Sequence, residues 1–273
     1  MFEQQRIKSR GGAALGMLEL IYHSIVRNMR KDHSNALIGL MMNMLQAVMF
    51  VAAFYFMFSV LGLRGVALRG DFVVYIMSGI FLFLTHTKAM SAVVGSEGPA
   101  SAMMKHAPMN TIIAISGAAL AQLYMQVLTA FVILFFYGVA IEPITIDRPI
   151  ATFGCLLLAW FTGVAVGMVF LAAKPWAPGF VAIASSLYAR ANMIASGKMF
   201  VANSMPSFML AMFDWNPLFH AIDQSRGFAF INYMPRNSSL DYPIYVALVL
   251  IMIGLMGEFY TRKHASESWG ARA

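Results

Sequence analysis

The amino-acid sequence predicts an all-α protein that crosses a membrane several times. Hydrophobic residues make up 60% of the 273 residues and charged residues only 11%, whereas soluble domains contain roughly 45–50% apolar and about 25% charged residues. A soluble domain of this size has no interior large enough to bury so much apolar surface. These observations argue against a soluble enzyme and favour one membrane domain that extends over residues 1–273.

Six stretches are long and apolar enough to be spans, since a transmembrane helix needs about 20 mostly apolar residues. In chain order they cover residues 35–63, 72–94, 112–137, 149–173, 178–202 and 242–260. Gly163 and Gly167 form a GxxxG pattern in the fourth span, which permits close helix approach. We expect an interfacial segment over 1–34, the spans within 35–261 and a tail over 262–273.

The segment before the first span predicts an amphipathic helix. Its apolar residues recur at alternating spacings of three and four, which is one face of a helix: Leu15, Leu18, Tyr22, Ile25 and Met29. Its other side carries Glu19, His23, Arg27, Arg30 and Lys31. Such a helix lies in the membrane interface with its basic side toward the headgroups. The alternative is an ordinary amphipathic helix packed on protein.

The distribution of positive charge orients the spans, because cytoplasmic loops carry an excess of Lys and Arg. With the N-terminus inside, twelve of the 19 Lys and Arg lie in cytoplasmic segments and five in outer loops. The remaining two, Arg190 and Lys198, lie within the fifth span. We therefore expect both termini in the cytoplasm, and we interpret the net charge of +7 as contact with anionic lipid rather than with nucleic acid.

Charged side chains inside a span are costly and are therefore candidates for function. Ser186 lies one helical turn before Arg190, and Lys198 lies about 80° around the helix from the face that Arg190 shares with Gly197. We expect Ser186, Arg190 and Lys198 to face a polar cavity or a partner subunit rather than lipid. Alternatively, Lys198 extends to the outer interface and Arg190 pairs with a neighbouring carbonyl.

The sequence lacks the patterns of the common catalytic sites. The nearest match to a phosphate-binding loop, Ser196-Gly197-Lys198, has Asn192 at the position of the upstream glycine and is followed by Met199 instead of Ser or Thr. The six His form no close set of metal ligands, and the 12 Asp and Glu are dispersed. These absences disfavour an enzyme, we expect no cofactor in this chain, and any energy from ATP would have to come from a partner.

The outer connection over residues 203–241 is too apolar for an open loop. We expect short helices that return into the outer leaflet. Asp214 or Asn216 can cap a helix whose first turn holds Pro217, a residue suited to that position.

The sequence after Arg190 carries a more specific signal. ANMIASGKMFVANSMP, followed by WNPLFHAIDQSRGFAFINY, resembles the last part of the permease subunits of bacterial polysaccharide-exporting ABC transporters, particularly the capsular polysaccharide export permeases. The layout of nearly the whole chain is similar as well. The matching residues are Ser196-Gly197, Pro206, Asn216-Pro217, His220, Asp223, where the family more often has Glu, and Arg226.

This resemblance implies a homodimer in the bacterial inner membrane that binds two copies of a separate ATPase. ATP and Mg²⁺ would be bound by that ATPase, and a lipid-linked or lipid-capped polysaccharide would move outward through a channel between the two permeases. Ser186, Arg190 and Lys198 would line this translocation path. A periplasmic polysaccharide co-polymerase is a further expected partner. The alternatives are an ABC permease for a lipid, a drug or another glycoconjugate such as O-antigen or teichoic acid, and a membrane enzyme with an acid or base at the lipid–water surface.

Two segments are candidates for coupling and gating. The cytoplasmic loop over 96–110 contains a possible short helix with an apolar side that suits a groove on the ATPase, formed by Met103, Met104, Lys105 and His106. In the outer segment, His220, Asp223 and Gln224 share one helix face, and Arg226 lies further round, where it can pair with Asp223 or reach the facing subunit. We expect Asn216, Pro217, His220, Asp223 and Arg226 to form an outer gate. The alternative is that they only cap and anchor their helix.

Overall fold

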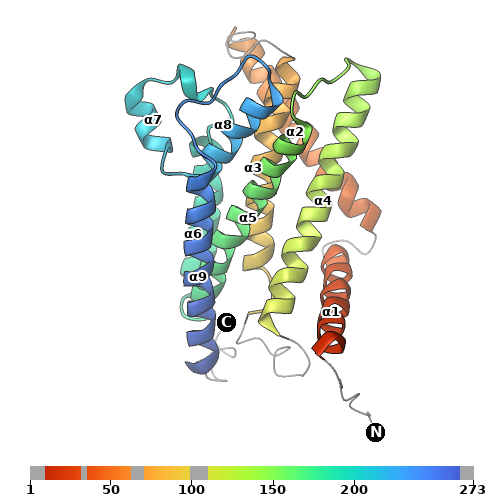
Figure 1. The fold of residues 1–273 in the computed structure, drawn as a ribbon, viewed down its shortest axis with the longest axis vertical. Coiled ribbons are helices and arrows are strands. Elements are labelled where there is room, and N and C mark those ends of the chain that lie inside the picture. The colour runs from red at the N-terminus through yellow and green to blue at the C-terminus, as the bar shows by residue number, and fades with distance from the viewer. Residues whose placement is uncertain (1–9, 32–35, 63–70, 99–109, 265–273) are drawn as a thin grey trace.

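A computed structural model describes residues 10–31, 36–62, 71–98 and 110–264, and this part of the chain is all-α (Figure 1). The long helices are α1 (Arg10–Lys31), α2 (Ala36–Val60), α3 (Phe72–Val94), α4 (Thr111–Ala140), α5 (Pro149–Ala173), α6 (Pro178–Ala195) and α9 (Asp241–His264). Between α6 and α9 lie the short elements η2 (Ala202–Ser204), α7 (Ser207–Phe213) and α8 (Pro217–Ala229). The start of α1 and the end of α9 lie at one end of the bundle, and α7 and α8 lie at the other.

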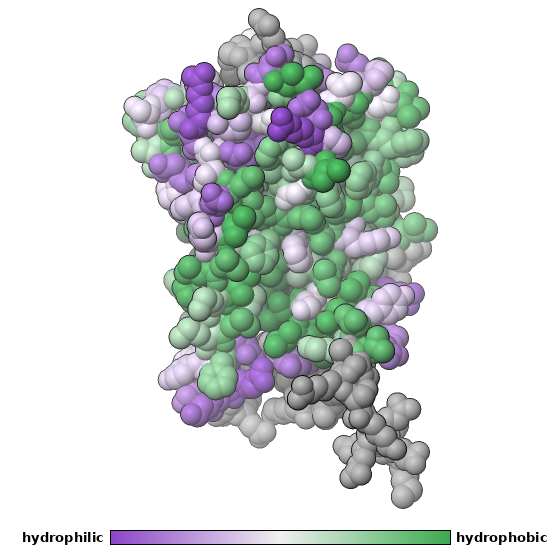
Figure 2. Space-filling view, viewed as in Figure 1, coloured by the Kyte–Doolittle hydropathy of each residue, from purple (hydrophilic) through white to green (hydrophobic). Residues whose placement is uncertain are grey.

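Five of these helices, α2, α3, α4, α5 and α9, are long and apolar enough to cross a membrane. Figure 2 shows the matching surface, with hydrophobic residues around the middle of the bundle and hydrophilic residues gathered toward its two ends. The chain is a multi-pass membrane protein. These helices agree with five of the six predicted spans.

Helices α3 and α5 form the centre of the bundle. In their most apolar stretches, 78% of the residues of α3 and 67% of those of α5 are buried, against at most 33% for α2, α4 and α9. The GxxxG pattern explains their close approach: a Cβ atom added at Gly167 would lie 2.8 Å from the Cβ of Val93, and one added at Gly163 would overlap the backbone of His86. The two glycines therefore join α5 to α3 within one chain.

Helix α1 forms as predicted and packs beside α4. The contact is made through Ser24, which is buried where α4 has Gly117, since a Cβ there would overlap the Ser24 side chain. Leu15, Leu18 and Tyr22 of the predicted apolar stripe remain exposed. The helix is thus packed on protein, and its stripe is left free to face lipid.

The predicted fifth span, 178–202, is wrong at its end. Helix α6 ends at Ala195, Ser196 caps it, and Gly197 turns the chain with φ of +68°. A Cβ at Gly197 would lie 2.5 Å from a ring atom of Phe219, so both the dihedral angle and the space require glycine. Lys198 consequently lies beyond the helix, and the predicted arrangement of Arg190, Gly197 and Lys198 around one helix does not exist.

The segment over residues 203–241 contains short helices, as predicted, and α8 is its buried part. Pro206 precedes α7, and α8 packs against α3, α5 and α9 at the end of the bundle. Most side chains of α8 are buried, including the charged Asp223 and Arg226. Its charged residues are therefore part of the fold rather than of a solvated surface.

Candidate functional site

Apart from Pro206, which precedes α7, the motif residues that carry the family resemblance come together in one place, which we term the α8 polar cluster. It consists of Asn192, the turn over residues 196–200, Asn216 directly before α8, the α8 residues His220, Asp223, Gln224 and Arg226, and the segment over 233–239. The cluster joins the end of α6 to α8 and to the chain that leads into α9.

Asn216 begins α8, which confirms one of the two predicted caps. Its Oδ1 accepts a hydrogen bond of 3.0 Å from the Leu218 N–H, and Pro217 follows at the first helical position. Its Nδ2 donates to Asn192 Oδ1 at 2.8 Å and to the Ala195 carbonyl at 2.9 Å. A single amide therefore caps α8 and fastens it to the last turn of α6.

Arg226 holds the turn that follows α6. Its Nη1 donates to the carbonyl oxygens of Gly197, at 3.1 Å, and Phe200, at 2.5 Å, while its Nη2 donates to the carbonyl of Lys198 at 2.5 Å. The side chain is only 1% exposed, and its guanidinium carbon lies 4.2 Å from the ring centroid of Tyr75 on α3. Such charge-assisted bonds are stronger than neutral ones, and here they satisfy three backbone acceptors of a buried turn.

The predicted pairing of Arg226 with Asp223 is wrong. Among the described residues Arg226 has no carboxylate within ion-pair distance, because its guanidinium points to the turn after α6 and Asp223 points to the opposite segment. The prediction that Arg226 reaches a facing subunit is also wrong, since the side chain is buried within its own chain. Gly79 on α3 makes room for this arrangement, as a Cβ there would lie 2.9 Å from Arg226 Nη2 and 2.9 Å from the Lys198 carbonyl oxygen.

The prediction that His220, Asp223 and Gln224 share one face of a helix is confirmed, and that face contacts residues 233–239. Gln224 Nε2 donates to the Ser238 carbonyl at 2.8 Å, and His220 Nδ1 accepts from the Ser239 N–H at 3.1 Å. Because Nδ1 accepts, Nε2 of His220 carries the proton and donates to the Asp214 carbonyl at 2.6 Å. The imidazole thus acts as a neutral bridge between two loops.

Asp223 is the acceptor at the centre of this face. Ser238 Oγ donates to its Oδ2 at 2.6 Å, and the Tyr233 hydroxyl donates to its Oδ1. Burial and the nearby Asp223 carboxylate raise the pKa of Tyr233, so that the phenol retains the proton it donates. The short Asp side chain fits between these two hydroxyls.

Of the three residues predicted to line a translocation path, Lys198 lies apart from the other two. Ser186 and Arg190 lie on the exposed side of α6. Lys198 is only 3% exposed, and its Nζ lies 3.3 Å from the ring centroid of Phe83 and 5.1 Å from that of Phe54, without a hydrogen-bond partner among the described atoms. The ammonium group therefore does not extend to the interface but points between α2 and α3.

Several residues that form or contact the cluster were not found by sequence reasoning. Asn192 could have been noticed as a polar amide within an apolar span, but its partner Asn216 lies 24 residues further along the chain. Tyr75 and Phe83 are indistinguishable in sequence from the many other aromatic residues of the spans. Tyr233 and Ser238 lie in an irregular segment with no periodic pattern. The predicted coupling residues Met103, Met104, Lys105 and His106 fall outside the described residues.

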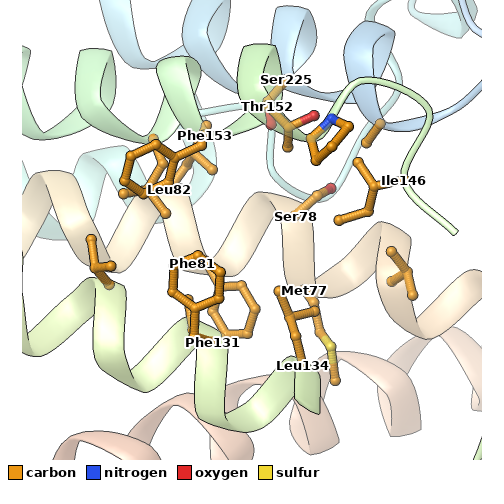
Figure 3. Close-up of a pocket in the computed structure, with 16 residues that line it drawn as sticks. Met77, Ser78, Phe81, Leu82, Phe131, Leu134, Ile146, Thr152, Phe153 and Ser225 are labelled. Carbon is orange, nitrogen blue, oxygen red and sulfur yellow. The ribbon is translucent and has the colours of Figure 1, made fainter. Parts of the chain in front are cut away.

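An apolar cavity of about 170 Å³ lies beside the cluster, between α3, α4, α5 and α8 (Figure 3). Phe81, Phe131 and Phe153 supply aromatic walls, and Ser225, which precedes Arg226, contributes a buried hydroxyl. This lining does not suit a hydrated sugar, which needs hydrogen-bonding groups on its walls. The cavity is therefore a poor candidate for a polysaccharide passage.

No family model matches the chain. The chain is 24% identical over 199 residues to the polysialic acid transport protein KpsM of Escherichia coli, a match that covers 71% of this chain and 75% of that protein. This distant homology confirms the resemblance to capsular polysaccharide export permeases that the motif residues indicate.

Proposed function

We propose that this chain is the membrane permease of an ABC exporter that moves a capsular or other lipid-linked polysaccharide from the cytoplasm to the periplasm across the bacterial inner membrane. Two copies of a separate ATPase would bind ATP and Mg²⁺ and drive a homodimer of this chain. The observation that carries the proposal is the α8 polar cluster. In it the two stretches of the export-permease motif contact each other, through Asn216 with Asn192 and through Arg226 with Gly197, in a chain that is distantly related to a polysialic acid transport protein.

The contacts of the cluster favour a particular form of outer gate. Asn216 and Arg226 join α8 to the end of α6 and to the following turn, while Asp223 joins it to residues 233–239. Since the side chains of Asn216 and Arg226 are themselves buried, separating α8 from α6 would leave an amide and a charged group unpaired. We therefore propose that α6 and α8 move as one unit when the gate opens, with the motif residues acting as the rigid joint.

We place the polymer path at the seam between two copies rather than within one. The exposed side of α6 carries Arg190 and Ser186 among large apolar residues such as Ile183 and Leu187. Leaving an arginine against lipid costs about 2.5–3.5 kcal/mol on insertion scales, so this side of α6 favours a second copy or a polar path as its cover. Lys198 would act only indirectly, by holding the turn against α2 and α3.

We further propose six crossings, with α6 as the sixth membrane helix and both termini in the cytoplasm. Helix α6 leads from the end of the bundle where α5 ends toward the end that holds α8 (Figure 1). Labelling of single cysteines with a membrane-impermeant thiol reagent tests this arrangement. Cysteines at Trp176 and His264 should be protected in intact cells, and one at Ser207 should react. Reaction at Trp176 from outside would exclude the proposed topology.

Deletion of this chain from its native bacterium tests the proposed function. Surface polysaccharide should be lost while the polymer accumulates inside the cell, which antibody staining before and after permeabilisation distinguishes. Re-expression of the wild-type chain should restore the surface polymer. Loss of polymer both inside and outside would instead indicate an enzyme of its synthesis, and unchanged surface polymer would indicate an exporter with a different cargo.

A further inference from the structure

A second cavity, of about 360 Å³, lies between α1, α2, α3 and α4, away from the α8 polar cluster. It differs from the first because polar side chains from all four helices line it: Asn28, Asn43, Gln46, Lys88 and Gln122. Lys88 lies six residues before the end of α3, about 9 Å along the helix axis. The cavity is thus within the bundle, in the half where α1 begins and α3 ends.

The cavity presents hydrogen-bonding groups at a depth where the helices are otherwise apolar. Gln122 Oε1 is buried without a hydrogen-bond partner among the described atoms. Asn28 Nδ2 donates to the carbonyl of Ser24 at 2.8 Å and to its Oγ at 3.4 Å. Asn43 Nδ2 donates to the carbonyl of Gly39 at 3.1 Å, and its NH₂ group has a second proton to donate. Polar groups in a hydrocarbon environment are costly unless they are paired, so the cavity suits a polar occupant.

The charge of the lining favours an anion. Lys88 supplies an ammonium group, the Asn side chains supply amide N–H donors, and the described lining contains no carboxylate. Gln122 Oε1 is an acceptor and would take a hydrogen bond from a hydroxyl group of the occupant. Arg30, two residues after Asn28 near the C-terminal end of α1, is exposed and adds positive potential at the approach to the cavity. A phosphate group offers several acceptor oxygens to such a set of donors.

The surroundings of the cavity indicate that this phosphate belongs to a lipid. Met42 lines the cavity and is also 51% exposed on the outside of α2, so the cavity reaches the surface of the bundle. Leu45 and Met49 continue this exposed apolar row at helical spacing along α2. A headgroup in the cavity could therefore leave its acyl chains along α2.

We propose that the cavity between α1, α2, α3 and α4 binds the phosphate of a lipid headgroup from the leaflet on the side where α1 begins. The site does not depend on the proposed transport function, because it requires only that the chain lies in a membrane. The phosphate could come from a membrane phospholipid or from a polyprenyl phosphate carrier, and the experiment below distinguishes the two sources.

Native mass spectrometry of the purified full-length chain tests the site. The protein is titrated separately with phosphatidylglycerol, with undecaprenyl phosphate and with a diacylglycerol that has the same acyl chains but no phosphate. We expect one phosphate-bearing lipid to be retained per chain and the diacylglycerol to be lost. Lys88→Gln should weaken retention roughly tenfold or more, as expected for loss of a charged hydrogen bond. Lys263→Gln, which removes an exposed cation near the end of α9, should change nothing.

Gln122→Leu provides a second test if Lys88→Gln fails to fold, because leucine removes the buried amide and keeps an apolar side chain of similar length. Selective retention of phosphatidylglycerol supports a structural phospholipid, and selective retention of undecaprenyl phosphate supports the carrier as the source. Equal retention of all three lipids, or retention of a phosphate-bearing lipid that neither cavity variant weakens, would overturn the proposal.

Discussion

Arg226 and Asp223 lie three residues apart on α8, yet they face opposite structures and do not pair. Arg226 donates to three carbonyls of the turn after α6, whereas Asp223 accepts from Ser238 and Tyr233 in the segment before α9. Each charge is thus compensated by neutral groups from a different part of the chain. Helix α8 is held from both sides, and this arrangement suggests how each charge can be tested alone.

Arg226→Ala should lower the free energy of unfolding by at least about 3 kcal/mol, since it leaves three buried carbonyls without donors. Arg226→Lys should be nearly as harmful, because a compact ammonium cannot reproduce the fork that reaches both Phe200 and Lys198. Thermal unfolding of the purified protein in detergent measures both effects. Arg236→Ala is the matched control at an arginine outside the turn. Wild-type stability of Arg226→Lys would show that the planar guanidinium is not required.

Asp223→Glu should destabilise the protein by about 1–3 kcal/mol, because the added methylene group overfills the space between Tyr233 and Ser238. Combining it with Ser238→Gly should recover part of this loss by making room. A double-mutant cycle of unfolding free energies measures the coupling between the two positions. Asp241→Glu, at the start of α9, is the control for the same chemical change. Strictly additive effects would contradict direct contact between residues 223 and 238.

The two cations predicted from the fifth span should respond differently to neutral substitution. Arg190→Gln should lower polysaccharide export while thermal stability is retained, because the residue is exposed on α6. Lys198→Met should leave export near the wild-type level and change stability little. Loss of the cation–π attraction destabilises the protein, whereas removal of a buried charge stabilises it, and the two effects oppose each other. Export is measured as surface polymer per cell, normalised to the amount of permease in the membrane. The reverse result would place Lys198, and not Arg190, on the path.

The parts of the fold that local sequence signals determine were predictable, and those that depend on contacts between distant residues were not. Long apolar stretches located five of the spans, and Asn216-Pro217 located the start of α8, because both signals are local. The end of α6 at Ala195 depends on a turn at Gly197 against Phe219, 22 residues further along the chain. The acceptors of Arg226 are backbone carbonyls, which leave no trace in the side-chain pattern. The sequence therefore indicated which residues form the cluster but not which atoms they contact.

Met103→Asp and Met104→Asp should each uncouple ATP hydrolysis from export, because a carboxylate on the apolar side of the expected coupling helix would oppose its burial in the ATPase. These residues lie outside the described part of the chain, so the prediction depends on the sequence and on the proposed function. Co-purification measures assembly, and ATP hydrolysis and surface polymer measure coupling. Lys263→Asp serves as a control for an added acid near the same end of the bundle. Normal export in both methionine variants would remove the loop from the coupling mechanism.

A covalent link between the outer segments of two copies should block export if α6 and α8 form a moving gate. Met212→Cys places a thiol on the exposed side of α7, and Cys155→Ser removes the native thiol, which is buried in α5. Joining two copies with bifunctional thiol reagents of increasing length should abolish export with the shortest reagent that reacts and restore it as the link lengthens. Folding and ATPase binding should be unaffected, and reduction of a cleavable link should restore transport. Export at the wild-type rate through the shortest link would reject the gate and leave the α8 polar cluster as an anchor of the outer helices.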